Sequence, residues 1–336
     1  MVTIKMVSER CGLSVSAVSK AMNGQPGISP ERAEEVRRIA AEMGYYPNAA
    51  ARALKTNHSQ NLGLIYQNDM AHEYFALVME GIREAAGQHQ YDLTLLCTPE
   101  DPVMDYYEHA RQRSCDGVIL AQNYIPIEQI DHLVHSSLPL VSIEASFPGH
   151  SSVTTENETS LMQLVQYLAH MGHRRIAYIY GDMGDTTRER LEGFRSGCEK
   201  YGLQIPEEYL IAGKFHNPAV AGRATRRLMA LPTPPTCILY PDDVSYLGGK
   251  AKLEDLGLTV GENISCVGYD GLQITSLMRP SLTSYRQNAK EIGRIAVEDL
   301  IFAIENPKNF VPQTYRVTGQ IQFGNTVKNL NENEEG

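Results

Sequence analysis

Six residues with groups that bind small molecules lie near the ends of apolar runs in the sequence: Tyr74, Phe75, Asn157, Arg190, Asp242 and Asp270. Carboxylates accept hydrogen bonds from neighbouring hydroxyl groups, an arginine donates in a fixed fork, and an aromatic ring stacks on a C–H face. The set therefore suits a polyhydroxylated ligand. Arg190 is its strongest member, because an arginine inside an apolar cleft needs an anionic or hydroxylated partner.

Structural roles remain open for three residues of this neighbourhood. A helix N-cap explains Asp243 at least as well as ligand contact does. Core packing is an equal alternative for Tyr74 and Phe75.

The sequence lacks the patterns that mark common enzyme sites. It contains no G-x-G-x-x-G, G-x-x-x-x-G-K-[ST] or G-x-S-x-G, and its ten histidines form no H-E-x-x-H. None of the six cysteines has a zinc-binding spacing, so we interpret them as reduced core thiols. We expect no enzyme activity, no cofactor and no metal site.

Short β-like runs alternate with amphipathic helical stretches over residues 61–324. Strands are expected at 62–66, 91–97, 117–121, 139–143, 175–181, 236–240 and 264–270. Helices are expected near 74–89, 103–114, 157–171, 187–201, 219–230, 244–256 and 289–305. Apolar strands between helices predict parallel sheets covered on both faces, here two doubly wound α/β subdomains. Such folds bind ligands at the carboxyl ends of their strands and in the cleft between subdomains, which would bring the six residues together.

The first 46 residues contain three short helical patterns. Two cover 4–11 and 15–22, and the third starts after Ser29, with Pro30 at its first position and Gly44 at its end. Two short helices joined by a three-residue turn that begins at Gly12 fit a helix-turn-helix. A three-helix bundle without a DNA-binding role is the alternative.

In a helix-turn-helix the second helix enters the major groove, and its exposed N-terminal residues meet the base edges. The residues expected to read bases are Val15, Ser16, Ala17 and Lys20. Polar groups suit contacts to the DNA backbone, and the expected set is Thr3, Ser14, Ser19, Asn23, Ser29, Tyr45 and Asn48. The charge distribution agrees with DNA binding by the N-terminal residues. Residues 1–60 hold eight Lys or Arg against five Glu, although the whole chain has a net charge of −10.

An alanine-rich stretch follows Pro47 and ends at Lys55. At about eight residues it is too short to form a stable isolated helix in water, so we expect it to fold only when docked. Leu54 beside two basic residues is similar to the leucine wedges that unstack a base step in the minor groove. The residues expected in the minor groove are Ala51, Arg52, Leu54 and Lys55.

The stretches TIKMVSERCGLSVSAVSKAMNG and YYPNAAARALKTNHS resemble the LacI/GalR family of bacterial transcription regulators. The similarity runs to about Gly324, through GHRRIAYI, the R-x-x-GF that starts at Arg190, and ISCVGYDG. Met6 stands where the family usually has Asp, and Ser8 where it usually has Ala. The resemblance places effector contacts on Arg190, Asp242-Asp243 and Asp270, and it reads the family's Asp-Asn pair as Glu156-Asn157. The changes at 156 and 242 leave the identity of the ligand open.

The family resemblance implies a homodimer of periplasmic-binding-protein type that binds a palindromic operator. Its two heads would lie in successive major grooves, with paired hinge helices in the central minor groove. A small sugar would then release the operator. In the alternative, a corepressor or a protein partner strengthens DNA binding. A stand-alone sugar-binding protein is a further possibility, but it would leave the helix-turn-helix at residues 1–46 unexplained. By resemblance alone, Leu247 and Met278 are expected in the dimer interface.

The expected organisation is a helix-turn-helix domain at 1–46, a hinge helix and linker at 47–60, and an effector-binding and dimerisation domain at 61–324, split near 156 and 287. We expect the acidic end, 325–336, to be disordered. No apolar run reaches the roughly 18 residues of a membrane span, and the N-terminus has no secretory stretch. We therefore expect a cytoplasmic protein.

Overall fold

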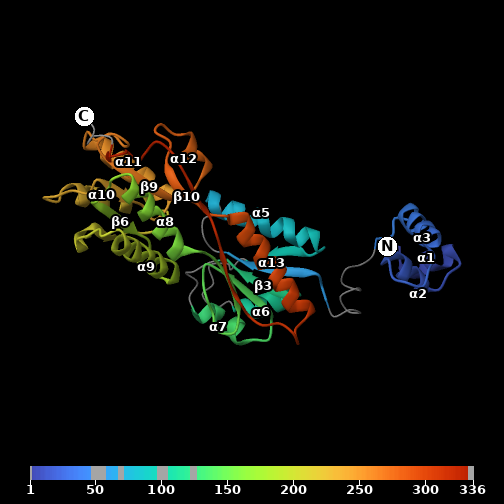
Figure 1. The fold of residues 1–336 in the computed structure, drawn as a ribbon. Coiled ribbons are helices and arrows are strands. Elements are labelled where there is room, and N and C mark those ends of the chain that lie inside the picture. Colours follow the sequence, from blue (N-terminus) through green and yellow to red (C-terminus); the bar gives the residue numbers. More distant parts are fainter. Residues whose placement is uncertain (1, 47–57, 67–71, 97–104, 122–126, 332–336) are drawn as a thin grey trace. The chain divides into compact units, whose positions relative to one another are not determined.

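The computed structural model describes residues 2–46, 58–66, 72–96, 105–121 and 127–331. They fall into two compact units, Met1–Asn61 and Leu62–Gly336, which are treated separately below (Figure 1). None of the described helices is both long and apolar enough to cross a lipid bilayer.

The described residues of the first unit form three helices, α1 (Ile4–Cys11), α2 (Val15–Met22) and α3 (Pro30–Glu42), at the positions that the sequence predicts. Each begins after a hydroxyl side chain that accepts a hydrogen bond from a backbone N–H of the first turn. Gly12 ends α1 in the left-handed conformation, at φ 64°, where a side chain would be strained. The core consists of Val7, Cys11, Val18, Ala21, Ala33, Val36 and Ala40.

One subdomain of the second unit is built on a six-stranded sheet with the order β11-β5-β4-β3-β1-β2. Its strands are β1 (Asn61–Ile65), β2 (Asp92–Leu95), β3 (Gly117–Leu120), β4 (Leu140–Ile143), β5 (Ser151–Thr155) and β11 (Thr314–Val317). Its helices are α5 (Glu73–Gln88), α6 (Tyr106–Gln112), α7 (Ile127–His135) and α13 (Ala289–Glu305). Helices α5 and α13 lie side by side on one face (Figure 1), while α6 and α7 cover the other.

The other subdomain has a second six-stranded sheet with the order β12-β10-β9-β8-β6-β7. Its strands are β6 (Ile176–Tyr180), β7 (Leu210–Ala212), β8 (Cys237–Leu239), β9 (Ser265–Asp270), β10 (Thr283–Arg286) and β12 (Gln320–Gln322). Its helices are α8 (Asn157–His170), α9 (Asp185–Lys200), α10 (Pro218–Met229), α11 (Asp243–Asp255) and the short α12 (Gln273–Leu277), with a 3-10 turn, η1, at Glu207–Tyr209. Along β6, Ile176 and Tyr178 face α8 and α9, whereas Ala177 and Ile179 face α10 and α11. Both sheets are thus covered on both faces, which confirms the predicted doubly wound class.

The chain passes between the sheets three times: after β5, after β10, and between β11 and β12. The sequence placed passages near 156 and 287 and missed the third. Strand β12 runs antiparallel to β10. The pairings β1–β3, β3–β4, β4–β5 and β5–β11 of the first sheet, and β6–β7, β6–β8, β8–β9 and β9–β10 of the second, are parallel. The last passage therefore ties the C-terminal segment to the second subdomain.

The expectation of disorder from residue 325 is wrong for residues 325–331. Thr326 is fully buried, its carbonyl accepts a hydrogen bond from the Cys266 N–H, and its hydroxyl accepts one from the Thr283 N–H. The Leu330 N–H donates to the Met171 carbonyl. A polar segment is ordered here because β9, β10 and the end of α8 offer unpaired backbone groups that it satisfies.

The five described cysteines are buried, which agrees with their interpretation as core thiols: Cys11, Cys115, Cys198, Cys237 and Cys266. Cys97 lies outside the described residues.

Candidate functional site

A cavity of about 720 Å³ lies between the two sheets of the second unit, and both subdomains line it. Five of the six predicted ligand residues are among its walls: Tyr74, Phe75, Arg190, Asp242 and Asp270. They meet there because the carboxyl ends of the parallel strands of both sheets open toward this space. The cavity is large enough for a sugar-sized ligand.

Two hydrogen bonds and a close contact with an aromatic ring fix the Arg190 side chain, and only 4% of the residue is exposed. Its Nε donates to Asn157 Oδ1 over 2.9 Å, and its Nη1 donates to the Pro241 carbonyl over 3.2 Å. The guanidinium carbon lies 3.6 Å from the centre of the Tyr269 ring. Asn157 does not line the cavity, so its place in the structure is behind Arg190, which it holds in position.

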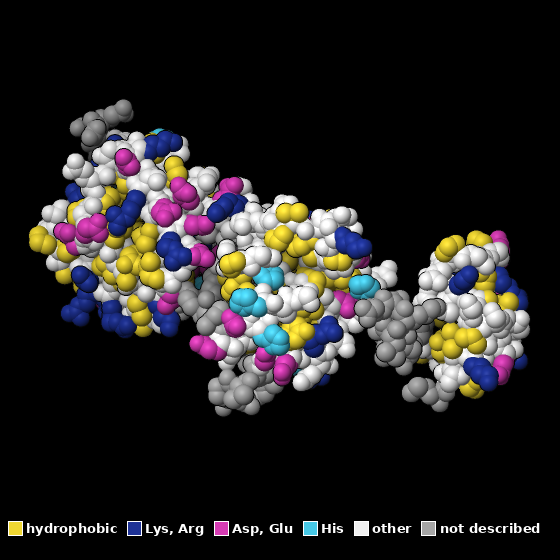
Figure 2. All heavy atoms as spheres, turned by 90° about the horizontal axis from the view of Figure 1, so that it is seen from below, with side chains coloured by type: hydrophobic (Ala, Val, Ile, Leu, Met, Phe, Trp, Pro, Cys, Tyr) yellow, Lys and Arg dark blue, Asp and Glu magenta, His cyan; other side chains and the backbone are white. Residues whose placement is uncertain are grey.

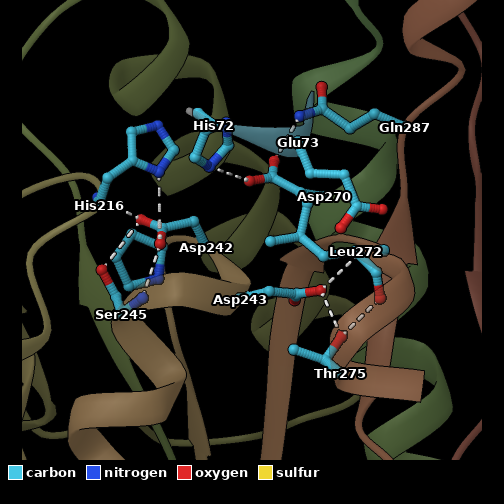
Figure 3. A network of polar contacts seen from close by, with 12 residues as sticks. His72, Glu73, His216, Asp242, Asp243, Ser245, Asp270, Leu272, Thr275 and Gln287 are labelled. Atoms are coloured by element: carbon cyan, nitrogen blue, oxygen red, sulfur yellow. Dashed lines mark hydrogen bonds and ion pairs between the residues drawn. The ribbon is translucent and has the colours of Figure 1, made fainter. Parts of the chain in front are cut away.

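Two adjacent aspartates after β8 have different structural roles. Asp242 caps α11, since its Oδ1 accepts a 2.7 Å hydrogen bond from the Ser245 N–H. Asp243 is not the N-cap, contrary to the alternative raised above. It accepts hydrogen bonds from the Ser284 and Thr275 hydroxyls and from the Leu272 N–H, at 2.6, 2.9 and 2.8 Å. Asp243 therefore ties α11 to β10 through Ser284. Through Leu272 and Thr275 it also ties α11 to the turn after β9 and to α12 (Figure 3).

Asp270 ends β9 in a conformation that L-residues rarely adopt, at φ 103°. Its Oδ1 accepts a 2.6 Å hydrogen bond from Gln287 Nε2, and Gln287 in turn accepts one from the Thr155 hydroxyl. Burial raises the pKa of Asp270 to about 8; the nearby His216 opposes that rise and the carboxylates Asp242 and Asp243 add to it. The carboxyl group is thus held at the junction of the two subdomains.

Aromatic and acidic groups of the first subdomain form the opposite wall. The Phe75 ring stacks on Tyr66, with centroids 3.3 Å apart and an interplanar angle of 4°. The Tyr74 hydroxyl donates to Glu144 Oε1 over 3.0 Å. Glu144 Oε2 also accepts from Thr186 on α9 over 3.2 Å, which joins the two subdomains. Phe75 is both packed and a wall residue, so the two interpretations of it do not exclude each other.

Several wall residues are absent from the predicted set: His72, Glu144, Lys214, His216 and Gln287. Glu144 directly follows the strand predicted at 139–143. The rule that ligand contacts lie at the carboxyl ends of strands, here called the strand-end rule, could therefore have found it. Lys214, His216 and Gln287 follow β7 and β10, short strands that the sequence pattern does not show. His72 precedes α5, and no feature of the sequence indicates that it lines the cavity.

His216 and Asp242 form a close pair that the sequence does not indicate. His216 Nδ1 lies 3.5 Å from Asp242 Oδ1, and the His216 N–H donates to Asp242 Oδ2 over 2.9 Å. Burial by itself raises the pKa of Asp242, but the hydrogen bonds and charge of His216 outweigh burial and hold that pKa below its ordinary value. Burial likewise lowers the pKa of His216, and Asp242 more than reverses that effect. The pair therefore favours the charged form of each partner.

On the first unit, the residues predicted to read bases lie at the start of α2 and one turn further on. Val15, Ser16 and Lys20 are exposed and Ala17 is half-buried, so this end of the helix is accessible. Figure 2 shows basic side chains next to hydrophobic ones on the surface of this unit. An exposed helix end with these side chains is compatible with entry into a major groove.

The predicted DNA-backbone residues have local structural roles. Thr3, Ser14 and Ser29 are helix caps, and Asn23 Nδ2 donates to the Ser19 carbonyl over 2.8 Å. Tyr45 packs against the helical core. Caps also fix the helix N-termini whose free N–H groups attract phosphates, so the two roles are compatible.

Other predicted residues lie outside the described part of the chain or away from the cavity. Asn48 and the minor-groove set Ala51, Arg52, Leu54 and Lys55 are not among the described residues. Leu247 and Met278 are half-buried and pack at the edge of the core of the second subdomain.

Comparison with known proteins relates both units to one group of regulators. Residues 3–48 match the family described as "Bacterial regulatory proteins, lacI family", and residues 165–327 match a periplasmic binding protein-like domain. The ribose operon repressor of Escherichia coli (strain K12) is 30% identical over 314 residues, which cover 91% of this chain and 94% of that protein. The HTH-type transcriptional repressor PurR of Haemophilus influenzae (strain PittEE) is 28% identical over 98% of this chain and all of that protein.

The fold is also that of a solved repressor. The structure of the lac repressor dimer bound to operator and the anti-inducer ONPF superposes with a TM-score of 0.80 at 22% identity, over 97% of this chain and 99% of that chain. With two curated relatives matched over nearly their whole length, the chain belongs to the lacI family of bacterial regulatory proteins.

Proposed function

We propose that this protein is a DNA-binding transcriptional repressor that a small sugar releases from a palindromic operator. The observation that carries the proposal is the cavity whose charged and aromatic walls come from both subdomains, on the chain that also holds a helix-turn-helix unit. Arg190, Asp270 and Glu144 offer donors and acceptors to hydroxyl groups, and Phe75 offers an aromatic face. The curated relatives are repressors rather than enzymes.

The cleft supports a mechanism of release. An effector that contacts Tyr74 and Phe75 on one side and Arg190 and Asp270 on the other binds best in one relative orientation of the subdomains. To move a two-state equilibrium from 1:99 to 99:1, it must prefer that orientation by about 5.5 kcal/mol. In the proposal this rotation separates the two hinge segments, which leave the minor groove. The site of action is the bacterial cytoplasm, where an operator lies.

The proposal keeps the predicted DNA contacts and the predicted dimer. Val15, Ser16, Ala17 and Lys20 read base edges, while Leu54 wedges into the minor groove of the operator centre. Leu247 and Met278 remain the proposed dimer contacts. No catalytic step is assigned to the cleft, since the acidic pair after β8 is already engaged in structural hydrogen bonds.

Fluorescence anisotropy of the full chain on duplexes from the region upstream of its own gene tests the proposal. Salt is held constant, because phosphate-driven affinity depends on it. A panel of neutral and phosphorylated sugars is then added. We expect tight binding that one sugar abolishes. If a ligand strengthens DNA binding, the ligand is a corepressor rather than an inducer. If no duplex is bound with or without sugar, the assignment as a repressor is overturned.

Two variants distinguish effector binding in the cleft from DNA binding by the helix-turn-helix unit in the same assay. Asp270→Ala should still bind the operator but no longer respond to the sugar. Asp255→Ala, an exposed aspartate at the end of α11, is the matched control and should respond as the wild type does. A full response in Asp270→Ala would contradict the placement of the effector in this cleft.

A further inference from the structure

Two histidines and an aspartate from both subdomains meet at one point of the cavity. The ligand atoms of His72, His216 and Asp270 all lie within 4.8 Å of one another. His72 Nε2 is 3.8 Å from Asp270 Oδ2, and the two imidazole rings have centroids 3.8 Å apart (Figure 3). His72 precedes α5 of the first subdomain, whereas His216 follows β7 and Asp270 ends β9 of the second. The cluster therefore bridges the cleft.

The orientation of His216 is that of a histidine prepared to bind a metal. Its Nδ1 faces Asp242 Oδ1 at 3.5 Å, which leaves Nε2 as the nitrogen available to a ligand. Asp242 is itself held by the Ser245 N–H and hydroxyl, at 2.7 and 3.0 Å. Metal-bound histidines usually donate their second ring nitrogen to such a carboxylate, which fixes the tautomer and the ring plane.

Asp270 presents one carboxylate oxygen to the histidines. Gln287 occupies Oδ1, while Oδ2 is buried and accepts no hydrogen bond from the residues that the structure describes. A buried carboxylate oxygen without a donor is costly, and a cation is the partner that best compensates it. The backbone at Asp270 is held at φ 103°, and such strain is typical of residues that the surrounding structure keeps in place for function.

The local charge favours a dication. Asp242 and Asp270 are both at least nine-tenths buried, and Asp243 lies close behind them. Arg190, whose charge acts on Asp270, is engaged by Asn157, Pro241 and the Tyr269 ring. A divalent ion bound by the two imidazoles would compensate the Asp270 carboxylate that faces it, while Asp242 lies behind His216.

We propose that His72, His216 and Asp270 bind a divalent transition-metal ion of the zinc, cobalt or nickel type within the cleft. Two imidazoles and one carboxylate are typical ligands of these ions, whereas magnesium and calcium prefer oxygen alone. The His216 side chain is 43% exposed and the three residues line the cavity, so the ion reaches the site from that space. Because the ligands come from both subdomains, the ion ties the subdomains together and favours the relative orientation that this structure shows. This inference goes beyond the sugar response, since the metal needs no sugar to bind.

Cobalt titration of the full chain, freed of metal with EDTA and then dialysed, tests the site. The readouts are the visible absorption of protein-bound Co²⁺ and the thermal unfolding midpoint, both without DNA or sugar. We expect one Co²⁺ per chain, displaced by Zn²⁺ and unaffected by Mg²⁺, and a higher unfolding midpoint with Zn²⁺. The absence of bound Co²⁺ would overturn the proposal and leave the operator assay untouched.

Variants assign the ligands. Asp242→Asn, which removes the carboxylate behind His216, should weaken Co²⁺ binding roughly 10–100-fold. His72→Gln and His216→Gln should each weaken it further. His135→Gln, at an exposed histidine of α7, is the control and should bind as the wild type does. Unfolding curves in EDTA show that each variant is folded, and unchanged Co²⁺ binding in both folded His→Gln variants would refute the site.

Discussion

Replacing Arg190 by methionine should destabilise the second unit, because this arginine organises the cleft before any ligand binds. The change removes the donors to Asn157 Oδ1 and to the Pro241 carbonyl and the contact with the Tyr269 ring. Each buried acceptor left without a donor costs about 1–3 kcal/mol, so the two cost about 2–6 kcal/mol. Methionine fills much of the space of the arginine stem, and the cost of burying a guanidinium disappears, which offsets part of the loss. We expect a net loss of about 2–4 kcal/mol in the free energy of unfolding.

The neighbouring Arg188 provides a matched control on the same helix. Its side chain is 59% exposed and pairs with Asp185, one turn away. Exposed pairs of this kind contribute about 0–1 kcal/mol, so Arg188→Met should unfold with the wild type. Urea and thermal unfolding, followed by circular dichroism without effector, measure both variants. A midpoint shift on the order of 10 °C is expected for Arg190→Met. If the two methionine variants unfold together, Arg190 is not the organising residue that the geometry indicates.

Stability, helix packing and DNA affinity offer further tests. Burial lowers the pKa of His173 to about 4, against about 6.5 in the unfolded chain, so stability present above pH 6.5 should fall by up to about 3 kcal/mol as the pH drops toward 4. His173→Gln should remove that loss in urea titrations, and an identical pH profile in wild type and variant would contradict it. A Cβ on Gly193 would overlap a backbone carbonyl of α8, so Gly193→Ala should cost about 1–3 kcal/mol. A Cβ on Gly87 has no neighbour within 4 Å, so Gly87→Ala is the control for Gly193→Ala in thermal unfolding. Equal unfolding midpoints of the two variants would argue against the close packing of α9 on α8. Lys20→Ala should weaken operator binding by about 1–3 kcal/mol and relax preference at one base position, which anisotropy on single-base operator variants detects. Leu54→Ala should weaken operator binding strongly with sugar binding intact, and an unchanged operator affinity would refute the hinge.

Local signals in the sequence were sufficient for most of the elements. Ser14 and Ser29, with Pro30 after the second, mark helix starts that depend only on backbone groups of the next turn. The central strands are continuous apolar runs and were found for that reason. Strands β7 and β12 have three residues each and are only partly buried, so no periodicity marks them. They exist because a neighbouring strand offers its edge, which is information that lies elsewhere in the chain.

The site residues also divide into those that the sequence predicts and those whose role only the structure shows. The strand-end rule found Arg190, Asp242 and Asp270, because in a doubly wound fold the position of a residue after its strand already places it at the cleft. The rule could not separate ligand contacts from supports. Asn157 turned out to hold Arg190, and Asp243 to brace β10, since those roles depend on which side chain from another segment lies within hydrogen-bond distance.

Composition, caps and apolar runs thus determined by themselves that the chain has a three-helix head and two doubly wound subdomains, and which strand ends face the cleft. The grouping of His72, His216 and Asp270 was decided only by the tertiary structure. No spacing predicts it, because these residues lie far apart in the sequence and are divided between the two subdomains. A local pattern records how a residue meets its own helix or strand, whereas a site shared by two subdomains depends on how both sheets pack around one cavity.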